Sequence, residues 1–249
     1  MKDNPLISII TVVYNGEQYL EQTIKSVMAQ TYPYLEYIVV DGGSTDGTLG
    51  IIKQYEGQIS KWVSEPDKGL YDAMNKGIGM AKGEIIGMIN SDDTYEPEAV
   101  QLIVDAFQRH PNKRIFHGDR NDIAEDGTIR VKRFDNSRFK FVYYGMTYNH
   151  PSMFVHREIY QKQLYNTDLR AFSDYEFVLK NLERHPEVFH YIPKSYVNYR
   201  LDGLSGSMST QQLLKEGFEA RKNGGLTSWQ NYFSWLLRWS VRTATGFRR

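Results

Sequence analysis

The sequence predicts an α/β fold, with an open, mostly parallel, Rossmann-like sheet that carries helices on both faces. Two observations predict it. Apolar, β-branched runs alternate with segments of helical periodicity along the first 115 residues. A polar cluster also follows each apolar run, as expected where ligands bind at the carboxyl ends of parallel strands. A chain of 249 residues accommodates one large domain of this kind.

Four apolar runs are expected to be strands. Residues 6–14 are nearly all apolar, which is typical of a strand buried on both faces of a sheet. Residues 37–40, 61–64 and 84–89 form the three shorter runs. Apolar side chains three or four positions apart predict a helix after each strand. These side chains include Leu20 and Ile24, Leu49 and Ile52, Met74 and Ile78, and Val100 and Val104.

The regular alternation of strands and helices does not continue in the second half of the chain. Residues 117–133 are expected to form a hairpin that turns at Asp126-Gly127. Residues 152–155 and 195–199 are expected to be strands, and residues 174–182 a helix. No linker rich in Pro, Gly or Ser separates the halves, so residues 116–225 are interpreted as an extension of the same domain, residues 1–225.

The composition excludes several classes of function. Thirty acidic and thirty basic side chains give a net charge of zero, so no global field attracts nucleic acid. The absence of cysteine excludes disulfides, zinc–thiolate sites and cysteine nucleophiles. The apolar run near the N-terminus is too short to span a bilayer, and no cleavage site follows it. A cytoplasmic location is therefore expected.

Two adjacent carboxylates, Asp92 and Asp93, directly follow the fourth predicted strand. Two adjacent carboxylates at a strand end repel each other, which costs free energy unless a cation is present. Mg²⁺ or Mn²⁺ is typically held by one or two carboxylates together with phosphate oxygens. The pair therefore predicts a metal–diphosphate site. The alternative is a solvated turn before the next helix.

Three more residues are candidates for binding a nucleotide. Asp41 ends the second strand, where its carboxylate can accept a hydrogen bond from a nucleobase N–H, or it can serve as a turn residue. Tyr14 ends the first strand, where it can stack on a base or pack in the core. Lys68, in the loop before a predicted helix, can reach a phosphate or a ribose hydroxyl, or remain solvated.

Asp174, at the start of a predicted helix, is the candidate general base. A sugar hydroxyl is a poor nucleophile until a group such as a carboxylate takes its proton. The alternative is that Ser173 or Asp174 caps the N-terminus of the helix.

The C-terminal segment, residues 226–249, is an aromatic and basic helix candidate. It holds three of the four tryptophans and several arginines, and it is too short and too charged to span a membrane. This composition suits a helix lying on an anionic membrane surface. The alternative is packing on the domain or on a second copy of the chain.

Four blocks together resemble the family 2 glycosyltransferases, in particular the branch that builds bacterial cell-surface polysaccharides. The blocks are residues 7–15, 40–48, 73–78 and 90–93, and the resemblance covers roughly residues 5–205. It implies a GT-A fold, a nucleotide-diphosphate-sugar donor, Mn²⁺ or Mg²⁺, and transfer of a hexosyl or N-acetylhexosaminyl group with inversion. Residues 1–115 would bind the nucleotide sugar, and residues 116–225 would form the acceptor side.

The resemblance also implies roles for single residues. Tyr14 and Asp41 would meet the base, Asp92 the ribose or metal, Asp93 the metal, and Asp174 would be the general base. Many members place an acid directly before that last residue, where this sequence has a serine. The Gln-x-x-Arg-Trp signature of processive members is absent. A polyprenyl-linked glycan acceptor, reached at the inner face of the membrane, is expected.

Two other classes of function stay open at this point. A sugar-phosphate nucleotidyltransferase also uses a Rossmann-like sheet and metal-binding acids, but it usually has a glycine-rich loop after the first strand, where this chain has Asn15-Gly16. A non-catalytic nucleotide- or sugar-binding module would not need both the acidic pair and Asp174.

Overall fold

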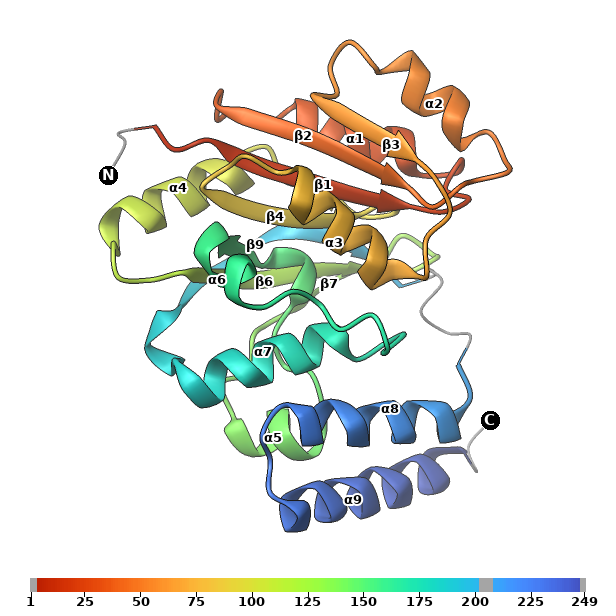
Figure 1. The fold of residues 1–249 in the computed structure, drawn as a ribbon, viewed down its shortest axis with the longest axis vertical. Helices are drawn as coiled ribbons and strands as arrows, with labels where there is room; N and C mark the ends of the chain where they lie inside the picture. Colours follow the sequence, from red (N-terminus) through yellow and green to blue (C-terminus); the bar gives the residue numbers. More distant parts are fainter. Residues whose placement is uncertain (1–3, 202–207, 247–249) are drawn as a thin grey trace.

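The computed structural model describes residues 4–201 and 208–246. Within them, a nine-stranded sheet has the order β3-β2-β1-β4-β8-β6-β9-β5, and β7 pairs with β6 beside this path. Figure 1 shows the sheet crossing the molecule, with helices packed on it and a separate pair of helices at one end. The predicted α/β class is confirmed.

The first four long strands form the parallel half of the sheet. β1 (Ile7–Val13) lies between β2 (Leu35–Asp41) and β4 (Ile85–Asn90), and β3 (Lys61–Ser64) extends the sheet beyond β2. Every residue of β1 is buried, as its uninterrupted apolar sequence predicts. All four predicted strands are confirmed, with ends that differ by one or two residues.

Helices cover both faces of this half. On one face, α1 (Leu20–Met28) and α4 (Ala99–Arg109) pack against the side chains of β1 that include Ile9, with α2 (Thr48–Gln54) beside α1. On the other face, α3 (Leu70–Met80) packs against the alternate side chains of the same strand. The two apolar clusters follow from the period of two along a strand.

The second half of the chain continues the same sheet. β8 (Phe154–His156) runs antiparallel to both β4 and β6 (Ile115–Ile123). β9 (Phe189–Arg200) pairs parallel with β6 and antiparallel with the short β5 (Thr94–Tyr95). The sheet therefore carries on past residue 115 without a break, and mixed pairing replaces the parallel pairing of the first half.

The hairpin predicted at residues 117–133 is confirmed. β6 pairs with β7 (Ile129–Lys132), and Gly127 adopts a φ of +80° in the turn. Two other expectations need correction. The strand expected at residues 152–155 is a 3₁₀ turn (His150–Ser152) followed by β8. The strand expected at residues 195–199 is only the last part of the twelve-residue β9.

Five helices complete the second half, with a second 3₁₀ turn (Pro186–Val188) after the third. The helices are α5 (Arg138–Tyr143), α6 (Arg157–Lys162), α7 (Ser173–Arg184), α8 (Thr210–Asn223) and α9 (Ser228–Gly246). α8 and α9 lie side by side at the end of the molecule away from β1–β3, with α5 against α9 and α7 against α8 (Figure 1). The predictions of α7 and α9 are confirmed, whereas α5, α6 and α8 were not predicted.

Candidate active site

The carboxyl ends of the parallel strands meet at one edge of the sheet. In the strand register, Val13 of β1 lies opposite Asp41 of β2, which lies opposite Ser64 of β3. On the other side of β1, Val12 lies opposite Asn90 of β4. The loops that follow these strands therefore start side by side, as the sequence predicts.

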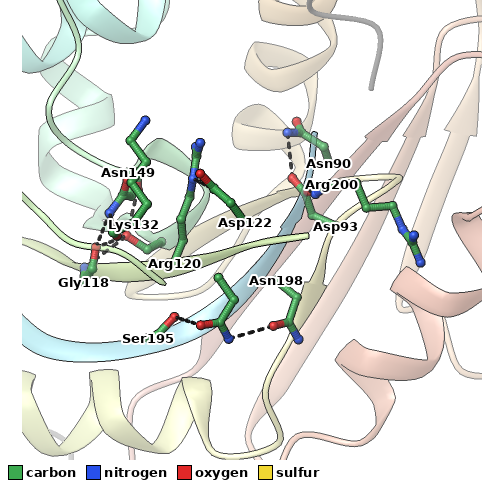
Figure 2. Close-up of polar contacts among 12 residues, drawn as sticks. Asn90, Asp93, Gly118, Arg120, Asp122, Lys132, Asn149, Ser195, Asn198 and Arg200 are labelled. Atoms are coloured by element: carbon green, nitrogen blue, oxygen red, sulfur yellow. Dashed lines mark hydrogen bonds and ion pairs between the residues drawn. The ribbon is translucent and has the colours of Figure 1, made fainter. Parts of the chain in front are cut away.

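The acidic pair lies at the end of β4, and Asp93 is completely buried. Its carboxylate accepts a hydrogen bond from Asn90 Nδ2 at 3.1 Å and another from the backbone N–H of Arg200 at 3.1 Å (Figure 2). Burial raises the pKa of Asp93 to about 8, and the neighbouring carboxylate of Asp92 adds to the rise. This is a position where negative charge is costly until a cation offsets it.

These residues fit a divalent cation held together with a diphosphate. Among residues 4–201 and 208–246, no group of three or more His, Asp or Glu side chains is arranged to hold a metal. Asp92 and Asp93 could supply only one or two ligands, so phosphate oxygens and water would complete the coordination. Mg²⁺ commonly binds in this way.

Asp41 lies inside the protein and not on its surface. The side chain has no exposed area, and its oxygens accept hydrogen bonds from Ser64 Oγ at 2.6 Å and from the backbone N–H groups of Gly43 and Ser44 at 3.2 and 3.1 Å. The hydroxyl of Ser44 donates to it as well. In this arrangement Asp41 fixes the loop after β2.

Tyr14 lies above that loop with 54% of its surface exposed, which excludes the alternative of a core aromatic. A Cβ added at Gly42 would touch the Tyr14 ring at 3.5 Å and would clash with the carboxylate of Asp67. The glycine therefore permits the close approach of these two side chains. Asp67, which sequence reasoning did not single out, thus joins Tyr14 at the strand ends.

Lys68 lies in the loop directly before α3, and its side chain is exposed. Its backbone N–H donates to Asp72 Oδ2 at 3.0 Å, which fixes the loop against the first turn of the helix. A cavity of about 140 Å³ opens here between the start of α3 and the segment before α7. Its lining residues are Lys68, Gly69, Leu70, Tyr71, Asp72, Thr167, Leu169 and Arg170.

Asp174 lies in the first turn of α7, where it is half-buried. The helix begins at Ser173, and Phe172 is its N-cap, so the alternative that Ser173 or Asp174 is the cap is wrong. The hydroxyl of Tyr71 donates to Asp174 Oδ1 at 3.0 Å, and the backbone N–H of Tyr175 donates to the same oxygen at 2.7 Å.

Tyr71 joins the two halves of the candidate site. Burial raises its pKa well above the ordinary value, and the charge of Asp174 adds to the rise, so the phenol remains a donor at neutral pH. Tyr71 lies in the first turn of α3, three residues after Lys68. The same helix end therefore carries the Lys68 loop and the hydroxyl that contacts Asp174. Sequence reasoning missed this tyrosine, since nothing in the local pattern links α3 to α7.

An exposed aromatic surface covers α9 and part of α5. The ring of Phe233 stacks on Trp229 with centroids 5.3 Å apart and meets Tyr143 of α5 edge-on at 5.3 Å. Its members, called the aromatic face below, are Phe139, Tyr144, Trp229, Tyr232, Phe233, Leu236 and Trp239, each at least 39% exposed. Within the described part of the chain, no helix is long and apolar enough to cross a membrane.

Comparison with known families gives a direct match. The family model described as glycosyl transferase family 2 matches residues 8–164, which is more than half of the chain. The chondroitin synthase of Escherichia coli is 29% identical over 221 residues, covering 87% of this chain and 32% of that protein. The chain thus spans about a third of that relative's length.

Solved structures show the same fold at low sequence identity. The structure of S. aureus TarS residues 1–349 in complex with UDP superposes with a TM-score of 0.69 at 18% identity, covering 91% of this chain and 68% of that one. The mannosyltransferase PcManGT from Pyrobaculum calidifontis, in complex with GDP-Man and Mn²⁺, gives a TM-score of 0.65 at 16% identity, with coverages of 98% and 75%. The expected GT-A fold is confirmed.

Proposed function

This chain belongs to glycosyl transferase family 2, and from that premise we propose that it transfers a sugar from a nucleotide-diphosphate-sugar to an acceptor hydroxyl, with inversion at the anomeric carbon. The observation that carries the proposal is the presence of two carboxylate sites, one directly after a strand of the parallel half and one on the helix that Tyr71 contacts. Asp92 and Asp93 end β4, and Asp174 is held by a hydrogen bond from Tyr71. The family match also favours this reaction over that of a nucleotidyltransferase.

The donor nucleotide is assigned to the edge of the sheet formed by the loops after β1, β2 and β3. Tyr14 presents an exposed ring on which a base can stack. Asp41, at the end of β2, holds the loop of Gly42 and Gly43 and is assigned to the base. Lys68 offers a positive charge to a phosphate or a hydrogen bond to the ribose. The bound nucleotide in TarS and the GDP-Man in PcManGT support a donor of this class.

Asp92 and Asp93 are assigned to the ribose and to a divalent cation. Bound Mn²⁺ or Mg²⁺ would offset the negative charge that grows on the departing diphosphate. The orientation of the Asp93 carboxylate is fixed before a cation binds, because Asn90 and the backbone N–H of Arg200 each donate to one of its oxygens. The Mn²⁺ in PcManGT supports a metal of this kind.

Asp174 is assigned as the general base. It takes the proton of the acceptor hydroxyl as the oxygen forms a bond to the anomeric carbon. The bond from that carbon to the diphosphate oxygen breaks, and its electron pair leaves with the nucleoside diphosphate. Attack from the face opposite the leaving group converts an α-linked donor into a β-linked product. Tyr71 keeps the carboxylate aimed by donating to Oδ1.

In this proposal, residues 1–115 bind the nucleotide sugar and residues 116–225 form the acceptor side. The aromatic face would bring the enzyme to an anionic membrane surface, where a polyprenyl-linked glycan intermediate of polysaccharide synthesis would be the acceptor. Exposed Trp and Tyr rings favour the membrane–water interface. Residues 228–249 contain four arginines and no acidic residue, which suits anionic lipid headgroups.

The reaction is tested by incubating the protein with UDP-, GDP- and dTDP-sugars and Mn²⁺, without and then with short glycan acceptors. Release of one nucleoside diphosphate, increased by one class of acceptor, is the expected result. Product analysis by NMR should show the anomeric configuration opposite to that of the donor. A retained configuration would contradict the single displacement, and failure of all donors to react would contradict the function.

A further inference from the structure

The hairpin of β6 and β7 places two cations directly opposite each other. Arg120 of β6 is the cross-strand partner of Lys132 on β7, and Asp122 is the partner of Arg130. Directly paired residues, and residues two apart on one strand, project on the same face of a sheet. This face therefore carries three basic side chains and one acidic side chain. Like charges directly opposite each other destabilise an antiparallel pair.

The single acid on this face already has a partner. Arg120 Nε donates to Asp122 Oδ1 at 2.6 Å, and the guanidinium also stacks over the Tyr199 ring at 3.8 Å. The side chain of Arg120 is only 12% exposed, so it is held in this position. In the described part of the chain, neither Arg130 nor Lys132, on a strand whose residues are all exposed, forms an ion pair of its own. The basic hairpin face, defined as Arg120, Arg130 and Lys132, has a surplus of positive charge.

This surplus lies beside the acidic pair. Ile123 at the end of β6 is opposite Arg200 of β9, whose backbone N–H binds the carboxylate of Asp93. Figure 2 shows the side chains of Arg120 and Lys132 projecting to the same side of the hairpin. Burial has the larger effect on the pKa of Asp93 and raises it, but the positive charge of Arg120 lies close enough to the carboxyl to lower it. In the order of the sheet, β8 separates β6 from β4. The basic hairpin face is therefore adjacent to the diphosphate position and does not coincide with it.

We propose that the basic hairpin face binds an anionic group of the acceptor, either a carboxylate or a phosphate, next to the hydroxyl that receives the sugar. The inference rests on the proposed function, because it takes the acidic pair as the position of the donor diphosphate. A bound anion would relieve the repulsion between Arg120 and Lys132. It would also select charged glycans over neutral glycans of the same shape.

The test compares three small probes by isothermal titration calorimetry, with and without UDP and Mn²⁺. Methyl β-glucuronide carries a carboxylate, glucose 6-phosphate carries a phosphate, and methyl β-glucoside is the neutral reference. We expect the protein to bind one of the anionic probes about tenfold more tightly than the neutral probe, with a preference that falls as salt is added. Equal binding of all three probes would overturn the proposal.

Three variants locate the effect. Lys132→Gln should abolish the preference, and Lys132→Arg should retain it because the charge is kept. The matched control, Lys53→Gln, removes an exposed lysine from α2 and should change nothing. A preference that survives Lys132→Gln would contradict the assignment.

Titration of UDP and Mn²⁺ into the same variants distinguishes a failure of this inference from a failure of the proposed function. Weaker binding of UDP and Mn²⁺ by Lys132→Gln would mean that the hairpin holds the donor diphosphate, and the acceptor assignment would be wrong. Normal UDP binding without any preference among the probes would contradict only the acceptor assignment. A preference for an anionic probe in a protein that binds no nucleoside diphosphate would support the anion site and contradict the proposed donor site.

Discussion

The hydroxyl of Tyr71 donates a hydrogen bond to Asp174 Oδ1 at 3.0 Å, across 103 positions of the chain. Tyr71 belongs to the helix that follows the Lys68 loop, and Asp174 belongs to the first turn of α7. One contact thus connects the nucleotide half of the proposed site with the acceptor half. The orientation of the proposed base depends on packing between α3 and α7.

Replacing the proposed base should abolish most of the turnover. Asp174→Asn keeps the shape and loses the proton acceptor, so kcat for transfer should fall by about 10²- to 10⁴-fold. The affinity for the nucleotide sugar should remain nearly unchanged, since Asp174 acts on the acceptor. Tyr71→Phe removes only the orienting hydrogen bond and should lower kcat by about tenfold. Steady-state kinetics and donor titrations check both values, and normal turnover by Asp174→Asn would exclude this role.

A matched pair of glycines tests the packing of α3 on the sheet. A Cβ at Gly77 would lie 2.5 Å from Ile10 Cγ2, so Gly77→Ala should destabilise the protein by about 1–3 kcal/mol. Gly79, in the same helix, has no heavy atom within 4 Å of such a Cβ. Gly79→Ala should stabilise the protein by roughly 0.5–1 kcal/mol. Urea unfolding measures both changes, and equal effects of the two substitutions would contradict this packing.

His117 should make the folded state sensitive to acid. Burial among aromatic rings lowers its pKa to about 3, and the charge of His190 adds to the shift, whereas the unfolded chain titrates near 6.5. Between these values the unfolded state binds a proton that the folded state does not. The stabilisation is therefore complete above pH 6.5 and decreases as the pH falls toward 3, by up to about 1.4 kcal/mol per pH unit.

The variant His117→Phe should remove this part of the pH dependence. The free energy of unfolding, measured by urea denaturation at several pH values from 7 to 4, should decrease less steeply than in the unmodified protein. The comparison concerns the slope, so any packing cost of the larger ring cancels. Parallel curves for the two proteins would show that His117 is not buried in its neutral form.

The aromatic face should bind anionic membranes. The double substitution Trp229→Ser and Trp239→Ser removes two exposed rings of α9, which are 69% and 48% exposed. It should abolish flotation with phosphatidylglycerol vesicles, while neutral phosphatidylcholine vesicles bind either protein weakly. Tyr34→Ser is the matched control, because it removes a ring that is also 48% exposed and lies directly before β2. Equal flotation of all variants would contradict a membrane role for this surface.

The parallel half of the fold could be predicted because its signals are local. The apolar run of β1 is buried along its whole length, and polar residues such as Asp41 mark the strand ends. The convergence of those ends follows from parallel pairing alone. The length of β9 was underestimated because Pro193 lies within its first half, and a proline argues against a strand at that position.

The parts of the site that escaped prediction depend on long-range contacts. The donor role of Tyr71 depends on a contact between α3 and α7, 103 positions apart in the chain. The burial of Asp41 under Ser44 and Ser64 requires the register of β2 and β3. The opposition of Arg120 and Lys132 requires the register of the hairpin. None of these relationships is present in a single segment of sequence.

The central claim is a metal-dependent nucleotide site at Asp93. Isothermal titration calorimetry with UDP, GDP and dTDP, each with and without Mn²⁺, tests it on the intact protein and on Asp93→Asn. That substitution keeps the shape of the buried carboxyl, which is mostly neutral at pH 7 until a cation binds, so the variant should remain folded. It removes the negative charge that the carboxylate would offer to the metal. We predict that one nucleotide binds tightly only with Mn²⁺, and that Asp93→Asn abolishes the metal-dependent part. Unchanged Mn²⁺-dependent binding by folded Asp93→Asn would contradict the account.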